Sequence, residues 1–142
     1  MSIKFEGFEK ALKFFDELAD TKEQKQTMGK ACAVVEAAAK KNAPKGNGEL
    51  RRSIESKVEF LGGDLVGVVS TPLEYAPYVE YGTGLFAENG DGRKEVPWVY
   101  QDDEGKYHST RGQKPHPFLR PALNDNREQV KKILIKGGFN ID

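Results

Sequence analysis

The first part of the chain predicts a short strand followed by a helix. The strand is expected at residues 3–5. The apolar residues after it recur at intervals of four, three and three, at Phe8, Leu12, Phe15 and Leu18. This spacing places the four side chains on one face of a helix, because an α-helix completes a turn every 3.6 residues.

A second helix is predicted over residues 22–43. Its many alanines lower the free-energy cost of forming a helix. Its apolar face consists of Met28, Cys32, Val35 and Ala39. Pro44 and the glycines at positions 46 and 48 are expected to end it, because proline cannot continue a helix and glycine favours turns.

The hydrophobic period changes to two at residue 53, which predicts strands. Charged residues alternate there with a face made of Ile54, Ser56, Val58 and Phe60, the pattern of a strand with one side in water. Gly62 and Gly63 can adopt the positive φ angles of a tight turn, so residues 65–70 are expected to return as the partner strand. A second hairpin is predicted from strands at residues 96–101 and 106–110, joined by a turn at residues 102–105.

The rest of the chain predicts an irregular segment and one more helix. Residues 71–95 form the irregular segment, with short helical potential at residues 76–81. The last helix is expected to begin after Pro117, to carry Pro121 in its first turn and to end at the Gly137-Gly138 pair. Its apolar side consists of Leu119, Leu123, Val130 and Leu134.

The order of these elements predicts an α+β fold. Helix, helix, hairpin, loop, hairpin and helix follow one another without the strand and helix alternation of a parallel sheet. We therefore expect an antiparallel sheet of two hairpins, packed by two N-terminal helices and one C-terminal helix. No internal repeat or linker is visible, so a single domain is predicted over residues 1–142.

Composition and charge exclude several classes of protein. The chain is 37% hydrophobic and 31% charged, which is ordinary for a globular protein. Its 22 basic residues balance 22 acidic ones, so the overall charge gives no reason to expect nucleic acid as a sequence-specific partner. No apolar run approaches the roughly 20 residues of a membrane helix. The N-terminus lacks a signal pattern, so we expect a cytoplasmic protein without a membrane partner.

The sequence assembles no catalytic or metal-binding set. A single cysteine, Cys32, can form neither an internal disulfide nor a cysteine zinc site, and we expect it to be buried. His108 and His116 lack a second donor at metal spacing. His108 and Ser109 would point to opposite faces of a strand, so they cannot act as base and nucleophile. We predict no enzymatic activity, no cofactor and no metal; a small hydrolase using Glu80 and His116 is the alternative.

Tyrosines are unusually dense between residues 75 and 81. Tyr75, Tyr78 and Tyr81 either cover the core beneath a long loop or anchor a subunit interface, where tyrosine is enriched. Long loops that carry glycine and exposed aromatic residues are commonly functional. We therefore predict that residues 71–95 act in assembly more than in the core.

Charge is distributed unevenly along the chain. Residues 40–57 contain six basic and two acidic residues, whereas residues 88–104 contain six acidic and two basic ones. In a closed ring each copy presents one surface to a different surface of the next. Arg51 and Arg52 of one copy could therefore meet Asp102 and Asp103 of another. The alternatives are that both patches are solvated, that they meet within one subunit, or that residues 40–57 contact nucleic acid.

Three motifs stand out, and together they resemble one protein family. They are APKGNGELRRSI at residues 43–54, YAPYVEYGTG at residues 75–84 and QKPHPFLRPAL at residues 113–123. In this order they resemble the small tail-completion or head-to-tail joining proteins of tailed phages and prophages, also described as minor tail components. Asn47 stands where that family often has threonine.

The resemblance implies a structural virion protein without an enzymatic role. Such a protein forms a ring of six copies at the head–tail junction after assembly in the host cytoplasm. The implied partners are other copies of the chain, the tail-tube protein and a head-closure or connector protein. A tail terminator, which caps the tail tube, is favoured over a head-closure stopper or another neck protein. The motifs leave open the phage, the host and the oligomeric state of the free protein.

The candidate assembly residues lie in or beside these motifs and patches. They are Arg51, Arg52, Tyr75, Tyr78, Glu80, Tyr81, Gly82, Thr83, Gly84, Phe86, Asp102, Asp103, Phe118 and Arg120. Gly82 and Gly84 permit a sharp exit from the tyrosine segment, and Phe118 can pack as a staple on the helix that it precedes. Glu80 and Arg120 are charged residues inside apolar motifs, which indicates a partly buried pair or a subunit contact.

Overall fold

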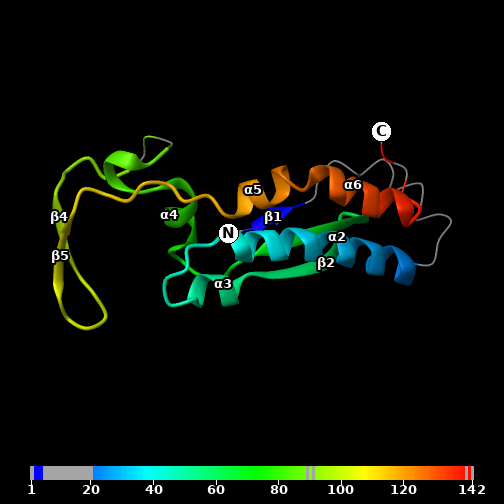
Figure 1. The fold of residues 1–142 in the computed structure, drawn as a ribbon, viewed down its shortest axis with the longest axis horizontal. Coiled ribbons are helices and arrows are strands. Elements are labelled where there is room, and N and C mark those ends of the chain that lie inside the picture. Colours follow the sequence, from blue (N-terminus) through cyan, green and yellow to red (C-terminus); the bar gives the residue numbers. More distant parts are fainter. Residues whose placement is uncertain (1, 5–20, 89, 91, 140, 142) are drawn as a thin grey trace. The chain divides into compact units, whose positions relative to one another are not determined.

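The computed structural model describes residues 2–4, 21–88, 90, 92–139 and 141 (Figure 1). The helix predicted around residues 8–18 lies outside the described residues. The chain divides into two compact units. The larger unit consists of Met1–Pro72 and Phe118–Asp142, and the smaller unit is Leu73–Pro117. A single folding domain over the whole chain stays a prediction.

The larger unit contains a three-stranded antiparallel sheet. Its order is β1 (Ser2–Lys4), β3 (Asp64–Ser70) and β2 (Glu55–Leu61). The turn between β2 and β3 is made by Gly62 and Gly63 with φ angles of 60° and 87°. The predicted first hairpin and the short N-terminal strand are therefore confirmed. Five consecutive residues of β3 are buried, and β3 is the central strand, with a paired strand on each edge.

The edge strand β2 follows the predicted alternation only in part. Ile54 is fully buried just before the strand, and Ser56 and Val58 are half-buried within it. Phe60 was expected on the same buried face but is 42% exposed. It lies next to the hairpin turn, where the Lys25 ammonium is 5.2 Å from the centre of its ring. The end of the hairpin therefore extends beyond the core.

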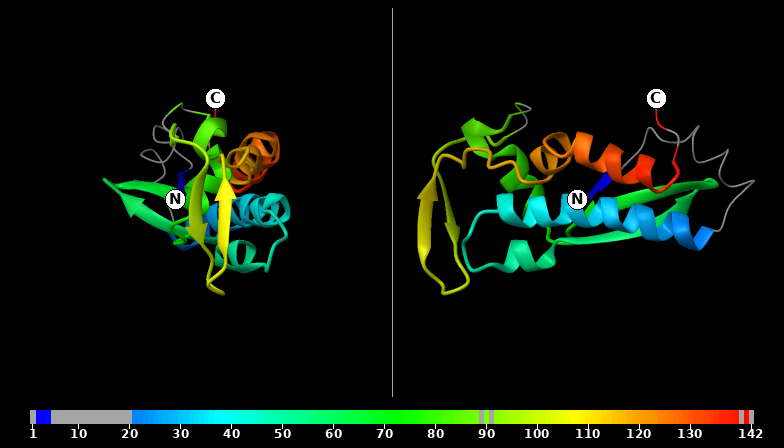
Figure 2. Two further views of the ribbon diagram at one scale, coloured as in Figure 1. Left: turned by 90° about the vertical axis from the view of Figure 1, so that its left-hand side faces the viewer. Right: turned by 45° about the vertical axis from the view of Figure 1, so that its right-hand side comes forward.

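Helix α2 (Thr21–Asn42) is the central helix of the larger unit, because it contacts both the sheet and the C-terminal helices. In both views of Figure 2, α2 runs beside the C-terminal helices. Its predicted apolar face is confirmed, since the whole set is buried: Met28, Cys32, Val35 and Ala39.

A polar contact also ties α2 to the sheet. The Glu36 carboxylate accepts a hydrogen bond from the Ser56 hydroxyl of β2 and pairs with the Lys40 ammonium at 2.6 Å. Burial alone would raise the pKa of Glu36, but the hydrogen bonds from Lys40 and Ser56 outweigh it and hold the pKa below its ordinary value. The helix is therefore linked to the edge strand by an ionised group.

A short helix, α3 (Glu49–Ser53), joins α2 to the sheet and was not predicted. It begins after Gly48, whose φ of 78° disfavours side chains, and the Asn47 side chain accepts a hydrogen bond from the Glu49 amide at 2.9 Å. At its other end, the Ser53 hydroxyl donates to the Leu50 carbonyl at 2.7 Å. Because five residues are too few to show a helical period, the hydrophobic pattern did not predict α3.

The predicted C-terminal helix is two helices, α5 (Leu119–Asn124) and α6 (Arg127–Lys136). The Asn126 side chain donates a hydrogen bond to the Ala122 carbonyl at 2.8 Å and so competes with the helical backbone pattern. Because of the break, the buried residues of the two helices differ from the predicted apolar side at one position. Leu119, Val130 and Leu134 are buried as predicted, whereas Ala122 is buried and Leu123 is only half-buried. The predicted end is confirmed, because Gly138 has a φ of 97° and the Phe139 amide donates to the Leu134 carbonyl.

The smaller unit contains helix α4 (Ala76–Tyr81), a 3-10 turn η1 (Gly84–Phe86) and a hairpin of β4 (Trp98–Gln101) and β5 (Tyr107–Thr110). The short helix and the second hairpin were both predicted. The described strands form two antiparallel sheets, however, whereas one sheet of two hairpins was expected. The α+β class is confirmed, with β2 and β3 in the larger unit and β4 and β5 in the smaller one.

Candidate assembly surface

Two distant parts of the sequence lie side by side in the smaller unit. The Thr83 amide donates to the Gln113 carbonyl at 2.9 Å, and the Gln113 amide donates to the Thr83 hydroxyl at 2.8 Å. The Leu85 amide donates to the Arg111 carbonyl at 3.1 Å. The end of the motif at residues 75–84 is therefore bonded to the start of the motif at residues 113–123.

This pairing explains the glycines of the second motif. Gly84 has a φ of 59°, and a Cβ atom there would overlap the Arg111 carbonyl oxygen. A Cβ atom on Gly82 would lie 2.7 Å from the Phe86 carbonyl oxygen. Gly112, on the opposite segment, would overlap the Thr83 carbonyl oxygen if it had a side chain. The two segments thus approach backbone to backbone, which larger residues would prevent.

The turn of the second hairpin is held by Asp102. One oxygen of its carboxylate accepts hydrogen bonds from the amides of Glu104 and Lys106 at 2.9 and 2.8 Å. The other oxygen is 2.7 Å from Nε2 of His108. The hydrogen bond to His108 is the main cause that lowers the pKa of Asp102 below its ordinary value. Asp102 therefore stabilises the turn of its own chain, a role that the sequence did not indicate.

The hairpin leaves both of its faces open to solvent. Tyr100 and His108 lie opposite each other on one face, with ring centres 5.3 Å apart. The other face carries Val99, which is 64% exposed, and Tyr107, which is 72% exposed. Single exposed apolar residues are normal, but exposed apolar patches commonly mark interaction sites.

A pocket of about 490 Å³ lies in the smaller unit. Its wall includes Tyr78, Tyr81, Ala87, Trp98 and the glycines at positions 82, 84 and 92. Arg93 lines the same pocket, and its guanidinium carbon is 5.4 Å from the centre of the Trp98 ring. The volume lies within the usual range for ligand-binding pockets, and the lining is mostly apolar with one cation.

The short helix that carries the tyrosine segment has one packed face and one exposed face. Tyr75 and Tyr78 are exposed, and Tyr81 is half-buried. Ala76 and Val79 between them are buried. The same short helix therefore packs with one face and presents tyrosines on the other, with exposed Phe86 following in η1.

The charged and aromatic residues of the other motifs have different surroundings. Glu80 is fully buried and Arg120 is half-buried; they belong to the smaller and the larger unit respectively. Phe118 is fully buried, and its carbonyl accepts a hydrogen bond from the Asn42 side chain at 3.4 Å. Phe118 is therefore a core residue, and its side chain is not available at a surface; its packing as a staple on α5 stays a prediction.

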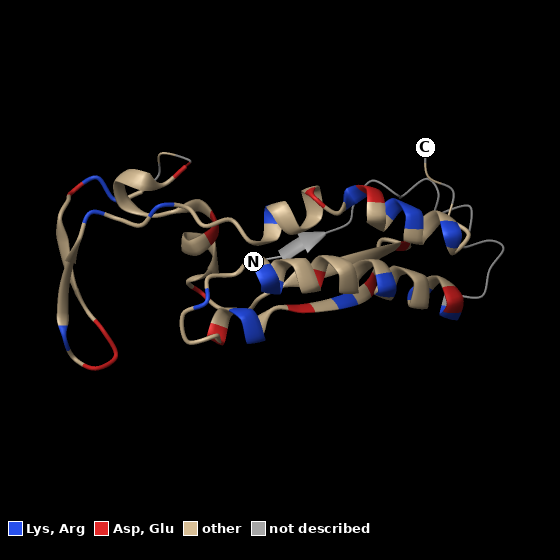
Figure 3. Cartoon of the chain, in the orientation of Figure 1, with Lys and Arg blue, Asp and Glu red and all other residues tan. Residues whose placement is uncertain are grey.

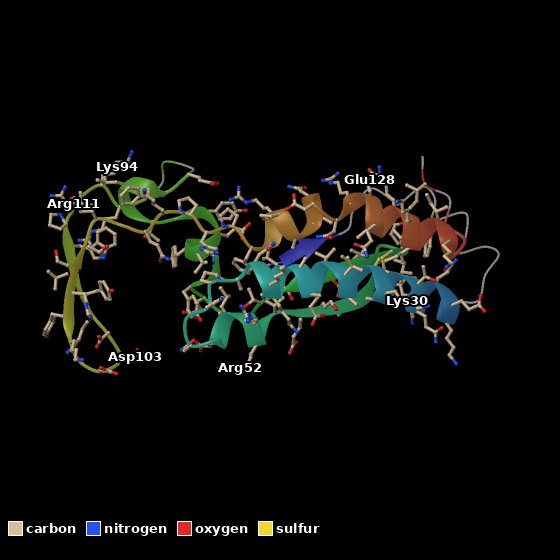
Figure 4. The ribbon with its side chains drawn as sticks, in the orientation of Figure 1. Lys30, Arg52, Lys94, Asp103, Arg111 and Glu128 are labelled. Carbon is tan, nitrogen blue, oxygen red and sulfur yellow. The ribbon has the colours of Figure 1, made fainter. Side chains whose placement is uncertain are left out.

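The two predicted charge patches are less uniform than the sequence indicated. In the basic patch, Arg51 is half-buried and Arg52 is exposed. The acidic patch is divided by the hairpin, and Figure 3 shows both charges at each end, with basic residues prevailing at the base and acidic residues at the turn. Figure 4 places Lys94 and Arg111 at the base and Asp103 at the turn. The base therefore has a net positive charge and the turn a net negative charge.

Within the described residues, no group of three or more histidine, cysteine, aspartate or glutamate side chains could hold a metal ion. None of the described helices is long and apolar enough to cross a membrane. Burial raises the pKa of the Cys32 thiol to about 11, so this cysteine is a core residue and a poor nucleophile.

A comparison with protein families identifies relatives of the chain. The sequence model of the HK97-gp10-like family, described as "Bacteriophage HK97-gp10, putative tail-component", matches residues 7–82. The match covers more than half of the chain and includes the motif at residues 43–54 and most of that at residues 75–84. No curated protein and no solved structure gave a match.

Proposed function

Since the chain belongs to the HK97-gp10-like family of bacteriophage tail components, we propose that it is a structural subunit of the ring that joins head and tail in a tailed phage or prophage. Within this junction we favour the tail terminator, which caps the tail tube, over the head-closure stopper. The partners are then other copies of the chain, the tail-tube protein and the head-closure or connector protein. Assembly in the host cytoplasm would leave the protein in the virion.

The exposed apolar surface of the smaller unit carries this proposal. Of the ten large apolar side chains that are exposed in the described chain, seven lie between Leu73 and Pro117. They are Tyr75, Tyr78, Leu85, Phe86, Val99, Tyr100 and Tyr107. Tyrosine and phenylalanine are enriched where proteins meet. A subunit of a permanent assembly needs such a surface, whereas a monomeric enzyme does not.

The test is deletion of the gene, followed by electron microscopy of the lysate. A tail terminator predicts full heads separate from tails that are overlong or unjoined. A stopper predicts tails of normal length beside heads that have lost their DNA. Normal infectious particles in the deletion strain would contradict both versions of the proposal.

Complementation then connects the phenotype to the surface. The doubly substituted Tyr78→Ser, Phe86→Ser chain should fold but fail to restore joined particles, because both side chains are exposed and on the smaller unit. Ile135→Ser is the matched control, since Ile135 is an exposed apolar residue of α6 in the larger unit. Equal rescue by both variants would show that the smaller unit is not the assembly surface.

A further inference from the structure

The hairpin β4–β5 lacks the support that a two-stranded sheet normally needs. An isolated hairpin is marginally stable in water, and independent stability requires a third strand or packing against a helix. In the described chain β4 pairs only with β5, and six of their eight residues are exposed. The hairpin therefore has the properties of an element that is covered in an assembly.

The two ends of the hairpin are chemically complementary. At the turn, Tyr107 is the most exposed large apolar residue of the described chain. The turn before it carries three acids, Asp102, Asp103 and Glu104, and one lysine, Lys106, which pairs with Glu104 at 3.1 Å. At the base, the pocket offers aromatic walls, with Arg93 at its lining and Lys94 and Glu95 next in sequence. One end is thus an aromatic side chain beside a turn of net negative charge, and the other is an aromatic cavity beside a segment of net positive charge.

These two ends cannot meet within one chain. Trp98, which lines the pocket, is three residues from Gln101, the strand partner of Tyr107. Three steps along a strand span about 10 Å, and an odd number of steps places the two side chains on opposite faces. Tyr107 therefore points away from the face that carries Trp98, and the complementary partner must be another molecule.

We propose that the turn of the β4–β5 hairpin of one copy docks into the pocket of a second copy, with Tyr107 among Tyr78, Tyr81 and Trp98. Asp103 and Glu104 of the first copy then lie against Arg93 and Lys94 of the second. Each copy has one turn and one pocket, so the contact is head-to-tail and can close a ring. The inference deepens the proposed function by naming the surface through which copies of the subunit meet.

A photo-crosslinking experiment tests the contact directly. Tyr107 is replaced by benzoylphenylalanine in the full chain, and unlabelled chains are mixed with ¹⁵N-labelled chains so that links between copies can be recognised by mass. Irradiation at about 1 mM protein would detect even a contact with a millimolar dissociation constant. We expect a link between position 107 of one copy and residues 77–98 of another. The same group placed at Ile135 should give no link to those residues.

Charge reversal tests the register of the contact. In the Asp103→Lys, Glu104→Lys chain the yield of the crosslink should fall about tenfold. A few exposed ion pairs together change the dissociation constant of a contact by about that factor. Adding Arg93→Glu and Lys94→Glu to the same chain should restore it. The control adds Arg51→Glu and Arg52→Glu instead and should restore nothing.

Each result is decisive. Absence of a link between copies at 1 mM, or a link outside residues 77–98, overturns the docking. Restoration by the Arg51 and Arg52 reversal shows that the turn binds the basic patch of the larger unit, which also overturns it. Failure of the docking leaves the deletion phenotype unchanged, so the proposed function and this inference can fail independently.

Discussion

Replacement of Gly84 by alanine should open the smaller unit while the larger unit stays folded. Gly84 has a φ of 59°, which costs an alanine about 1 kcal/mol, and its Cβ atom would overlap the Arg111 carbonyl oxygen. Relief of that overlap requires residues 111–113 to move away from residues 83–85. The movement breaks three hydrogen bonds, from the Thr83 amide to Gln113, from the Gln113 amide to Thr83 and from the Leu85 amide to Arg111. Together they contribute about 2 kcal/mol. The total cost is about 3 kcal/mol.

Gly90 provides the matched control for Gly84→Ala. Its φ is 73°, and a Cβ atom there would meet nothing within 4 Å. Gly90→Ala should therefore cost only the conformational term of about 1 kcal/mol. The difference of about 2 kcal/mol corresponds to about a 30-fold difference in local opening.

Amide hydrogen exchange measures this difference residue by residue. In Gly84→Ala the amides of Thr83, Leu85 and Gln113 should exchange about 30-fold faster than in Gly90→Ala, whereas the amides of α2 should be unchanged. Equal exchange in the two variants would show that the close approach of the two segments contributes nothing to the stability of the smaller unit. Loss of protection in α2 would show instead that the two units unfold together.

Three further predictions follow from single contacts. Leu134→Ala should lower the free energy of unfolding by about 2 to 5 kcal/mol in a denaturant titration, because Leu134 is fully buried, whereas Ile135→Ala on the exposed side of the same helix should change it by less than about 0.5 kcal/mol. Cys32 in the native protein should react with a thiol reagent only as fast as the chain opens, because burial raises its pKa to about 11; rapid reaction of the folded protein would contradict its place in the core. The hairpin turn should be fully formed above the ordinary pKa of an aspartate and should open as the pH falls through the lowered pKa of Asp102. The NMR signals of the Glu104 and Lys106 amides report its opening. Asp102→Asn should remove this pH dependence.

Elements with several turns or a clear alternation could be predicted from the sequence. Helix α2 has six turns in which to repeat its apolar face, and its burial agrees with the prediction at every position of that face. Both hairpin turns contain a glycine with positive φ, at Gly63 and Gly105, which the sequence displays directly. Strong local signals of this kind do not depend on the rest of the fold.

Features that depend on a single side chain could not be predicted in this way. The break between α5 and α6 rests on one hydrogen bond from Asn126, and asparagine is common enough in helices that its presence alone indicates no break. Division of the strands into two sheets rests on contacts between distant residues. The role of Asp102 depends on three hydrogen bonds that form only when the turn closes.

In the candidate site, too, the backbone and the exposed side chains have separate roles. Its glycines are required by the close approach of residues 82–84 to residues 111–113, so this part of the motif serves the backbone frame. The side chains on that frame, such as Tyr78 and Tyr107, are exposed and have no part in making it. A change at Gly84 should therefore weaken both the folding of the smaller unit and assembly, whereas a change at Tyr107 should weaken assembly alone. Because the frame can stay constant while exposed side chains vary, related chains could keep one architecture and still recognise only their own copies.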